Sequence, residues 1–331
     1  MDKSNLRNRG GQISIGSKED GAIMEMFKID DHLLIIKEFA VYELIFADDI
    51  DPNRENPDLP LNSQKLLFEF GTESEIFSRI FLLAKRLFKA EYVDASINIA
   101  DSTWLVVDML QELSEMIKEA EALKEMEQQA ATEYDLRKNK GLDHATPSII
   151  NIKTKCKTIF QKLDQFYQAQ LSLIRKFYPD FSEQSYYSKF LEYLQEKYKA
   201  EDDFSRFLEE VLPIIMLSRN IRNCLDHRRN EINISNFELQ IDSNILTPTI
   251  SIDYNGSQLK KTSLTGFIQE MIEYAVVIAE NMLAFLTSNN LKKNRILPGN
   301  VKFIPEEERT NKYCKFAYWS PLGEGGFYDQ K

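Results

Sequence analysis

The residues best suited to chemistry lie in one short stretch, residues 218–229, which reads SRNIRNCLDHRR. This stretch crowds Arg, Asn, Asp and His together directly after an apolar run at 207–217. An imidazole moves protons near neutral pH, and a guanidinium can neutralise the charge on a phosphate in a transition state. This combination of side chains therefore indicates phosphoryl chemistry.

A helix over this stretch predicts which side chains share a face. At about 100° per residue, apolar and polar side chains separate onto opposite faces. The apolar face comprises Ile214, Leu217, Ile221, Cys224 and Leu225, and the polar face comprises Arg219, Arg222, Asn223, Asp226 and His227. Residues four apart are neighbours on a helix, so we expect Asn223 beside His227 and Arg222 beside Asp226. We expect the polar face to point toward solvent or a partner.

The sequence Arg222-Asn223-x-x-x-His227 resembles the signature of the HEPN superfamily. In that signature an Arg, a polar residue and a His stand near the end of a helix in an all-α bundle. The resemblance implies an activity like that of the prokaryotic HEPN ribonucleases, many of which need no metal and dimerise to form one composite site. It implies that His227 acts as general base or acid around the ribose 2′-OH, that Arg222 contacts the scissile phosphate, and that Asn223 orients His227 or the phosphate. Cleavage would leave a 2′,3′-cyclic phosphate.

Other charged residues near the motif are candidates for supporting roles. Asp226 could hold His227 or pair with Arg222, and Arg219 lies about one turn before the motif. RNA contacts are expected from the cations Arg228, Arg229, Lys260 and Lys261. The alternative is a solvated helix end, in which Arg222 and Asp226 form an ordinary ion pair and basic residues complement the helix dipole.

Composition limits how the chain could bind nucleic acid. With 331 residues, 43% of them hydrophobic, and only 12 Gly and 10 Pro, the chain is typical of a globular protein with long helices. The net charge of -11 argues against a general nucleic-acid coat protein, because non-specific binding requires neutralisation of phosphates. A nuclease would therefore depend on local positive charge, such as the arginines of the motif stretch.

The sequence contains no motif for a competing active site. A P-loop, a dinucleotide glycine fingerprint, a zinc HExxH motif and a G-x-S-x-G elbow are all missing. The three Cys and three His are too widely separated to predict a zinc site or a disulfide framework. We therefore expect no metal and no cofactor. With no apolar signal region and no apolar run of transmembrane length, we expect a cytoplasmic protein that does not bind membranes.

The periodicity of apolar residues predicts a mainly α protein. Helices are expected over 22–48, from residue 73, over 93–129, 149–178 and 182–199, from about 203 to the motif, and over 267–287. Alternating β-branched residues at 237–241 and 249–254, followed by Asn255-Gly256, predict a small β-hairpin inserted before the last long helix.

Changes in composition predict five regions along the chain. They are a disordered or loose arm (1–20), an N-terminal helical region (21–130), a linker (131–147), a HEPN-like bundle of up-down antiparallel helices (148–290) and an irregular tail (291–331). The linker is inferred from Gly141 and Pro147, which interrupt helical periodicity.

The HEPN resemblance, together with the absence of a competing site, predicts a metal-independent endoribonuclease that acts on RNA as a homodimer with a composite Arg/His site. The resemblance implies a toxin or anti-phage role, with an antitoxin or another regulatory protein as a partner. The alternative is a non-catalytic HEPN-like helical module that binds RNA, a nucleotide or a protein partner. In that alternative Arg222 and His227 serve only in ion pairs.

Overall fold

The structure is a computed structural model. It describes residues 14–140, 145–181, 186–199, 201–242, 244–292, 299–322 and 325–330. Helices make up 49% and strands 20% of the structure, and the described residues form four separate sheets. The protein is therefore mixed α and β, and the prediction of a mainly α-helical bundle is wrong. The chain divides into two compact units, Met1–Val107 with Leu283–Lys331, and Asp108–Met282.

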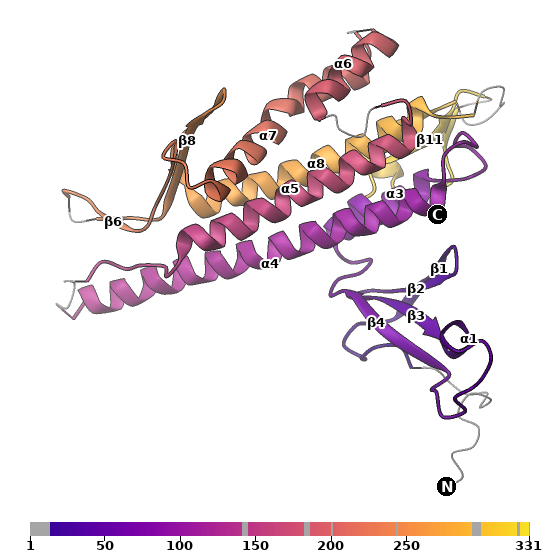
Figure 1. Ribbon diagram of the computed structural model, residues 1–331, viewed down its shortest axis with the longest axis horizontal. Coiled ribbons are helices and arrows are strands. Elements are labelled where there is room, and N and C mark those ends of the chain that lie inside the picture. The colour runs from indigo at the N-terminus through magenta and orange to yellow at the C-terminus, as the bar shows by residue number, and fades with distance from the viewer. Residues whose placement is uncertain are drawn as a thin grey trace. The chain divides into compact units, whose positions relative to one another are not determined.

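The first unit contains a four-stranded antiparallel sheet in the order β1-β2-β3-β4 (Figure 1). Its strands are β1 (Ile23–Ile29), β2 (His32–Lys37), β3 (Val41–Phe46) and β4 (Asn62–Phe68), and the short helix α1 (Ala47–Ile50) follows β3. This sheet replaces the helix predicted over 22–48. The chain turns between β1 and β2 at Asp30, whose φ of 49° lies in the left-handed region that short polar residues tolerate.

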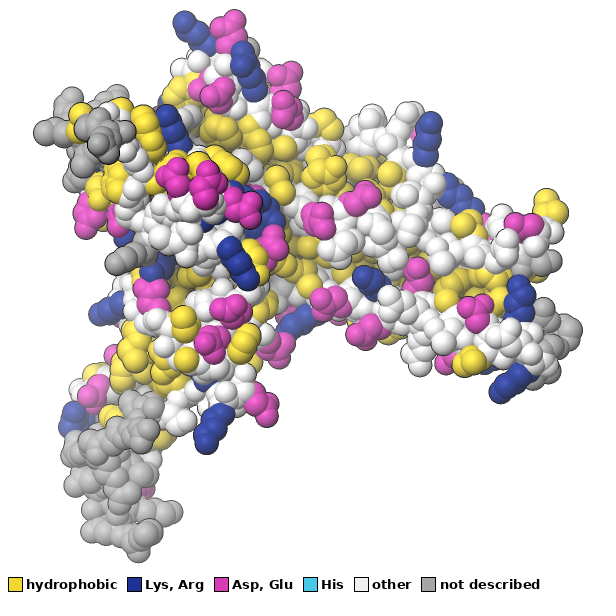
Figure 2. Space-filling model, turned by 180° about the vertical axis from the view of Figure 1, so that it is seen from behind, with side chains coloured by type: hydrophobic (Ala, Val, Ile, Leu, Met, Phe, Trp, Pro, Cys, Tyr) yellow, Lys and Arg dark blue, Asp and Glu magenta, His cyan; other side chains and the backbone are white. Residues whose placement is uncertain are grey.

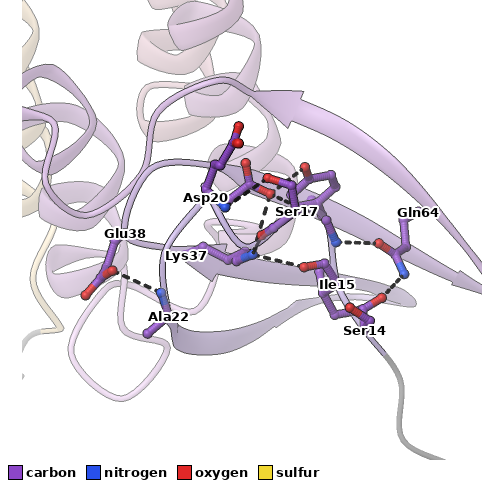
Figure 3. Close-up of polar contacts among 11 residues, drawn as sticks. Ser14, Ile15, Ser17, Asp20, Ala22, Lys37, Glu38 and Gln64 are labelled. Atoms are coloured by element: carbon purple, nitrogen blue, oxygen red, sulfur yellow. Dashed lines mark hydrogen bonds and ion pairs between the residues drawn. The ribbon is translucent and has the colours of Figure 1, made fainter.

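A buried lysine fastens the segment before β1 to this sheet. The Lys37 amine donates hydrogen bonds to the carbonyls of Ile15 and Ser17, at 2.9 and 2.6 Å, and lies 3.5 Å from a carboxylate oxygen of Asp20 (Figure 3). The amide of Gln64 forms two further hydrogen bonds with the backbone of the same segment. The described part of the predicted N-terminal arm is therefore held against the sheet.

Replacing Lys37 with Ala is expected to release this segment. The change removes the donor from two carbonyls, and each buried polar group left unsatisfied costs about 1–3 kcal/mol. Limited proteolysis should therefore cut the segment before β1 faster in Lys37→Ala than in the wild type. Lys28→Ala, at an exposed position on β1, is the matched control and should be cut at the wild-type rate. Equal protection in the Lys37 and Lys28 variants would contradict the assignment.

Short helices and a second sheet complete the first unit, together with the ends of two long helices. They are α2 (Glu75–Phe77), the π-helical turn η2 (Ser78–Leu82), α3 (Leu83–Leu87), β10 (Asn300–Phe303), the 3-10 turn η3 (Glu306–Glu308), β11 (Phe316–Ser320) and β12 (Gly326–Tyr328). The strands pair in the order β10-β11-β12, and the Tyr318 hydroxyl donates to the carbonyl of Leu87. The helix predicted from residue 73 is confirmed. The tail predicted to be irregular contains this sheet instead.

The second unit is built mainly from long helices (Figure 1). They are the larger part of α4 (Ile99–Lys138), α5 (Ile152–Phe177), α6 (Tyr187–Tyr198), α7 (Asp203–Asp226) and the first part of α8 (Leu264–Asn289). An ion pair at 3.1 Å joins Lys162 of α5 to Glu112 of α4. The rings of Phe160 on α5 and Phe267 on α8 stack with centroids 6.2 Å apart. The packed helices thus surround a shared apolar core.

Small sheets lie between α7 and α8 in the sequence. Their strands are β5 (Ile232–Ser235), β6 (Glu238–Leu239), β7 (Ile245–Leu246), β8 (Thr249–Tyr254) and β9 (Ser257–Ser263). Strand β8 and the turn at Asn255 and Gly256 were predicted, and both turn residues have positive φ angles, as such turns require. The partner of β8 in this hairpin is β9, which was not predicted, and the strand predicted over 237–241 appears as the short β6, which pairs with β7. Strand β5, which pairs with β8 and follows the motif directly, was not predicted.

The predicted boundaries differ from the described elements in several places. Helix α4 continues to Lys138, so it occupies the first part of the linker predicted over 131–147. Gly141, which supported the linker, and the first part of the predicted arm, residues 1–13, lie outside the described residues.

Helix α8 is the most apolar of the long helices that the structure describes. Among the described residues it alone is long and apolar enough, by length and composition, to cross a membrane, and 67% of its apolar window is buried inside the structure. This burial is compatible with the core helix of a soluble protein. On the face drawn in Figure 2, acidic and basic side chains are interspersed with exposed hydrophobic ones. Anion binding would therefore depend on local charge.

Candidate functional site

Helix α7 carries the motif and is closed at both ends. At its N-terminus the Asp202 carboxylate accepts hydrogen bonds from the backbone N–H groups of Phe204 and Ser205. At its C-terminus the N–H of Arg229 donates to the carbonyl of Cys224 at 2.9 Å, and Arg228 adopts a left-handed φ of 50°. This is the Schellman arrangement, in which the left-handed position is usually glycine. An Arg there costs conformational energy that glycine would not.

The core face of α7 follows the prediction at its most buried positions. Ile221 and Cys224 are fully buried, as expected from helical spacing. Asn220 is also buried, and its amide donates to the Ser257 hydroxyl at 2.9 Å. This hydrogen bond ties the motif helix to β9. The buried polar role of Asn220 was not predicted.

Arg222 faces helix α5 in this structure. Its Nε and Nη2 donate to one carboxylate oxygen of Asp164, at 3.2 and 2.6 Å. Its Nη1 donates to the Asn223 side-chain oxygen at 2.9 Å and lies 3.5 Å from Asp226. Burial alone would lower the pKa of Arg222, but the hydrogen bond and charge of Asp164 outweigh burial and raise it. Asn223 therefore orients Arg222, and its side chain makes no described contact with His227.

Asp226 also turns toward α5. One of its oxygens accepts a hydrogen bond from the Gln161 amide at 2.9 Å and lies 3.1 Å from the Lys157 amine. Its other oxygen lies near Arg222, which confirms the predicted pair four residues apart. A link between Asp226 and His227 is not observed among the described residues. The polar face of α7 is therefore largely engaged by α5 of the same chain, whereas it was predicted to face solvent or a partner.

His227 is the motif residue that remains open to solvent. It caps α7, and its backbone N–H donates to the carbonyl of Asn223 at 3.0 Å. Its side chain is exposed and makes no hydrogen bond or ion pair with any residue that the structure describes. The imidazole is thus available to a ligand, while Arg222 is held a short distance back along the helix.

Arg219 supports the same helix interface from the preceding turn. Its guanidinium carbon lies 3.1 Å from the centroid of the Tyr186 ring, a cation–π contact. The Tyr186 hydroxyl is hydrogen-bonded to Gln168 of α5. Burial raises the pKa of Tyr186, and the negative charge of Asp164 adds to this effect. Arg219 is thus used for packing.

A pocket of about 900 Å³ opens beyond the end of α7, between α5 and β5. It is lined by the cations Lys153, Lys157, Arg228 and Arg229, by apolar Cys224, Leu225, Ile232 and Ile234, and by Thr154, Thr158, Gln161, Asn230 and Asn233. None of the described lining residues is acidic. Arg228 and Arg229, two of the four cations predicted to contact RNA, both line this pocket. Lys260 and Lys261 do not line the pocket, and Lys261 pairs with Glu238 at 2.6 Å.

The part of this site on α5 was missed in the sequence. Lys157, Gln161 and Asp164 follow one another at spacings of four and three residues, so they form one polar stripe on a helix. A polar stripe on an otherwise apolar helix indicates that its side chains have polar partners. This stripe and the polar face of α7 were the signal from which the contacts between the two helices could have been predicted. Asp164 lies 58 residues before its partner Arg222, and Gln161 lies 65 residues before its partner Asp226. Local spacing cannot reveal pairs so far apart in the sequence.

The cysteines of the two units are buried, and burial disfavours the thiolate. It raises the pKa of Cys156 to about 12, and it also raises the pKa of Cys224, with Glu231 adding to the effect and Arg229 opposing it. These thiols therefore pack as apolar groups and do not act as nucleophiles.

We expect Cys156 to resist alkylation in the folded protein. Because its pKa is raised, the thiol stays protonated at about pH 8, where only about one in ten thousand would be thiolate. Iodoacetamide labelling followed by peptide mass spectrometry should show protection that disappears in denaturant. Labelling of the folded protein at the rate of a free thiol would contradict the described burial.

Among the described residues, no group of three or more His, Cys, Asp or Glu side chains is placed to hold a metal ion. Comparisons of the chain with protein-family models, with curated proteins and with solved structures found no match.

Proposed function

We propose that the protein is a metal-independent endoribonuclease of the HEPN type, acting at the C-terminal end of α7. The observation that carries this proposal is the exposed imidazole of His227, which has no described partner and directly precedes Arg228 and Arg229 in the chain. These two arginines are among the four cations that line a pocket with no acidic residue in its described lining, although His227 itself does not line it. A polyanion such as RNA is attracted to local positive charge even when the net charge of the protein is -11.

The chemistry of the site is transfer of the phosphate within RNA. A base removes the proton of the ribose 2′-OH, the 2′ oxygen bonds to phosphorus, and the bond from phosphorus to the 5′ oxygen breaks. The leaving 5′ oxygen takes a proton from an acid, and the products are a 2′,3′-cyclic phosphate and a 5′-OH end. The imidazole of His227 performs one of these proton transfers.

Arg222 is suited to stabilise the phosphate without leaving Asp164. Its Nε and Nη2 are engaged by Asp164, whereas its Nη1 donates to the Asn223 side chain at 2.9 Å and makes a longer contact of 3.5 Å with Asp226. A phosphate oxygen can replace the Asp226 contact at Nη1 and neutralise developing charge. Asp164 then fixes the orientation of the guanidinium.

A second copy of the chain completes the composite site. One imidazole cannot be base and acid in the same step, so the reaction calls for a second proton-transfer group opposite the first. A homodimer that brings two copies of His227 together supplies both. The toxin or anti-phage role and the regulatory partner follow from the HEPN resemblance and are part of this proposal. The cytoplasmic location predicted from the sequence is part of it as well.

One observation favours the non-catalytic alternative, a module that binds RNA, a nucleotide or a protein. Arg222 is held by Asp164 and lies near Asp226, so it already has partners within the chain. In that alternative Arg222 stabilises the helix interface, and the pocket binds its ligand without cleavage.

Incubation of the purified protein with structured RNAs in EDTA tests the proposal. The wild type should cut RNA and leave 2′,3′-cyclic phosphate ends, detected by their loss on acid treatment and by mass spectrometry. His227→Ala, purified in the same way, reveals any contaminating nuclease. Intact RNA with the wild type, or equal cutting by both proteins, would favour the non-catalytic alternative.

A further inference from the structure

The pocket beyond α7 holds positive charge that the protein itself does not neutralise. Lys153, Arg228 and Arg229 form no ion pair with any described residue, and Lys157 shares the carboxylate of Asp226. The nearby acidic groups are Asp226 and the exposed Glu231 next to the lining residues. Positive charge therefore exceeds negative charge among the residues around the pocket, which favours an anionic ligand.

Arg228 adds an independent sign of function. A non-glycine residue in the left-handed conformation is strained, and such strain is concentrated at binding and catalytic sites. Glycine would close α7 with the same backbone hydrogen bonds and without the strain. The side chain of Arg228 lines the pocket, where its positive charge can meet an anionic ligand.

The pocket also has an apolar part and a flat cationic surface. Leu225, Ile232 and Ile234 line it, and the guanidinium carbon of Arg229 lies 4.9 Å from the centroid of the Tyr254 ring. A guanidinium held in this way offers a plane on which a nucleobase can stack. A volume of about 900 Å³ is large enough for a nucleotide.

We propose that this pocket holds one unpaired nucleotide of single-stranded RNA, so that the substrate class is single-stranded RNA and loops. The phosphate lies against Lys153 and Arg228, and the base lies against the apolar residues and Arg229. A base within a duplex is stacked and paired and cannot enter such a pocket without being flipped out. The choice of RNA as ligand rests on the proposed function.

Binding measured in the His227→Ala background separates this proposal from catalysis. The probe is a fluorescein-labelled RNA of about 12 nucleotides without self-complementarity, used single-stranded and annealed to its complement. Fluorescence anisotropy should give a Kd about tenfold lower for the single strand than for the duplex. Adding Arg228→Gly or Lys153→Ala should raise the single-strand Kd about five- to tenfold. Arg228→Gly is the more informative variant, because glycine adopts the left-handed backbone conformation of this position without strain. The change therefore removes the charged side chain and leaves the end of the helix intact.

Lys189→Ala is the matched control, since Lys189 is exposed on α6 and does not line the pocket. It should leave the Kd unchanged. Equal affinity for single strand and duplex, or an unchanged Kd with Arg228→Gly, overturns the pocket proposal. If the wild type does not cleave RNA but binding is single-strand-specific and depends on Arg228, the pocket stands and the nuclease proposal fails. If the wild type cleaves RNA but binding of the single strand does not depend on Arg228, the nuclease proposal stands and the pocket proposal fails.

Discussion

His227→Ala is expected to slow RNA cleavage by about 10²–10⁴-fold, the contribution of one positioned proton-transfer group. The side chain is exposed and makes no described hydrogen bond or ion pair, so its removal should leave the melting temperature nearly unchanged. A large loss of rate at constant stability would therefore report on chemistry. The rate is measured under single-turnover conditions in EDTA, with Tm measured on the same preparation.

His32→Ala provides the matched control for this variant. His32 lies on β2, where its imidazole contacts Glu43 at 2.5 Å, and it belongs to the first unit. Its removal should leave the cleavage rate within about twofold of wild type, because no proton-transfer role is assigned to it. A fall of less than about tenfold in His227→Ala would contradict the assignment of a catalytic imidazole.

Asp164→Ala is expected to destabilise the protein by about 3 kcal/mol, because it leaves the charge of Arg222 without its main partner. The Asp164 side chain is 8% exposed and that of Arg222 28% exposed, so water cannot fully replace the lost carboxylate. The remaining contact with Asp226 and the partial exposure of Arg222 place the loss at the low end for a broken buried pair. Urea unfolding followed by circular dichroism measures the free energy of unfolding.

Two further variants separate charge from packing at this position. Asp164→Asn keeps an acceptor oxygen for Arg222 and removes the charge, so its loss should fall between wild type and Asp164→Ala. Glu192→Ala breaks the exposed pair with Lys189 on α6 and should cost at most about 0.5 kcal/mol. A loss below about 1 kcal/mol in Asp164→Ala would mean that the ion pair contributes little to the helix interface.

The end of α7 could be predicted from the sequence because the information there is local. Helical spacing identified the buried Ile221 and Cys224 and the neighbours Arg222 and Asp226, and the Asn255-Gly256 turn located the hairpin. The polar face was expected to face solvent or a partner, because no local signal shows that Asp164 lies opposite. That pairing is set by packing of α5 on α7.

The first sheet was missed for a different reason. The apolar residues of β1 to β3 stand close enough together to fit a helical period as well as an alternating one. The turn at Asp30 and the β-branched residues of β2 favour strands over a helix. Both signals are weak in the sequence alone, because a strand is stabilised by pairing with its neighbours. The pocket could not be predicted either, because it requires β5 and α5 to meet at the end of α7.

The hydrogen bonds that end helix α7 determine which residues at its C-terminus can be substituted in evolution. The carbonyls of Asn223 and Cys224 near its end accept hydrogen bonds from the backbone N–H groups of His227 and Arg229, and not from the side chains of His227 or Arg228. Both side chains can therefore be exchanged while the helix still ends at the same place. Related sequences can then lose the imidazole or change the cation, and so trade one ligand preference for another, on an unchanged scaffold.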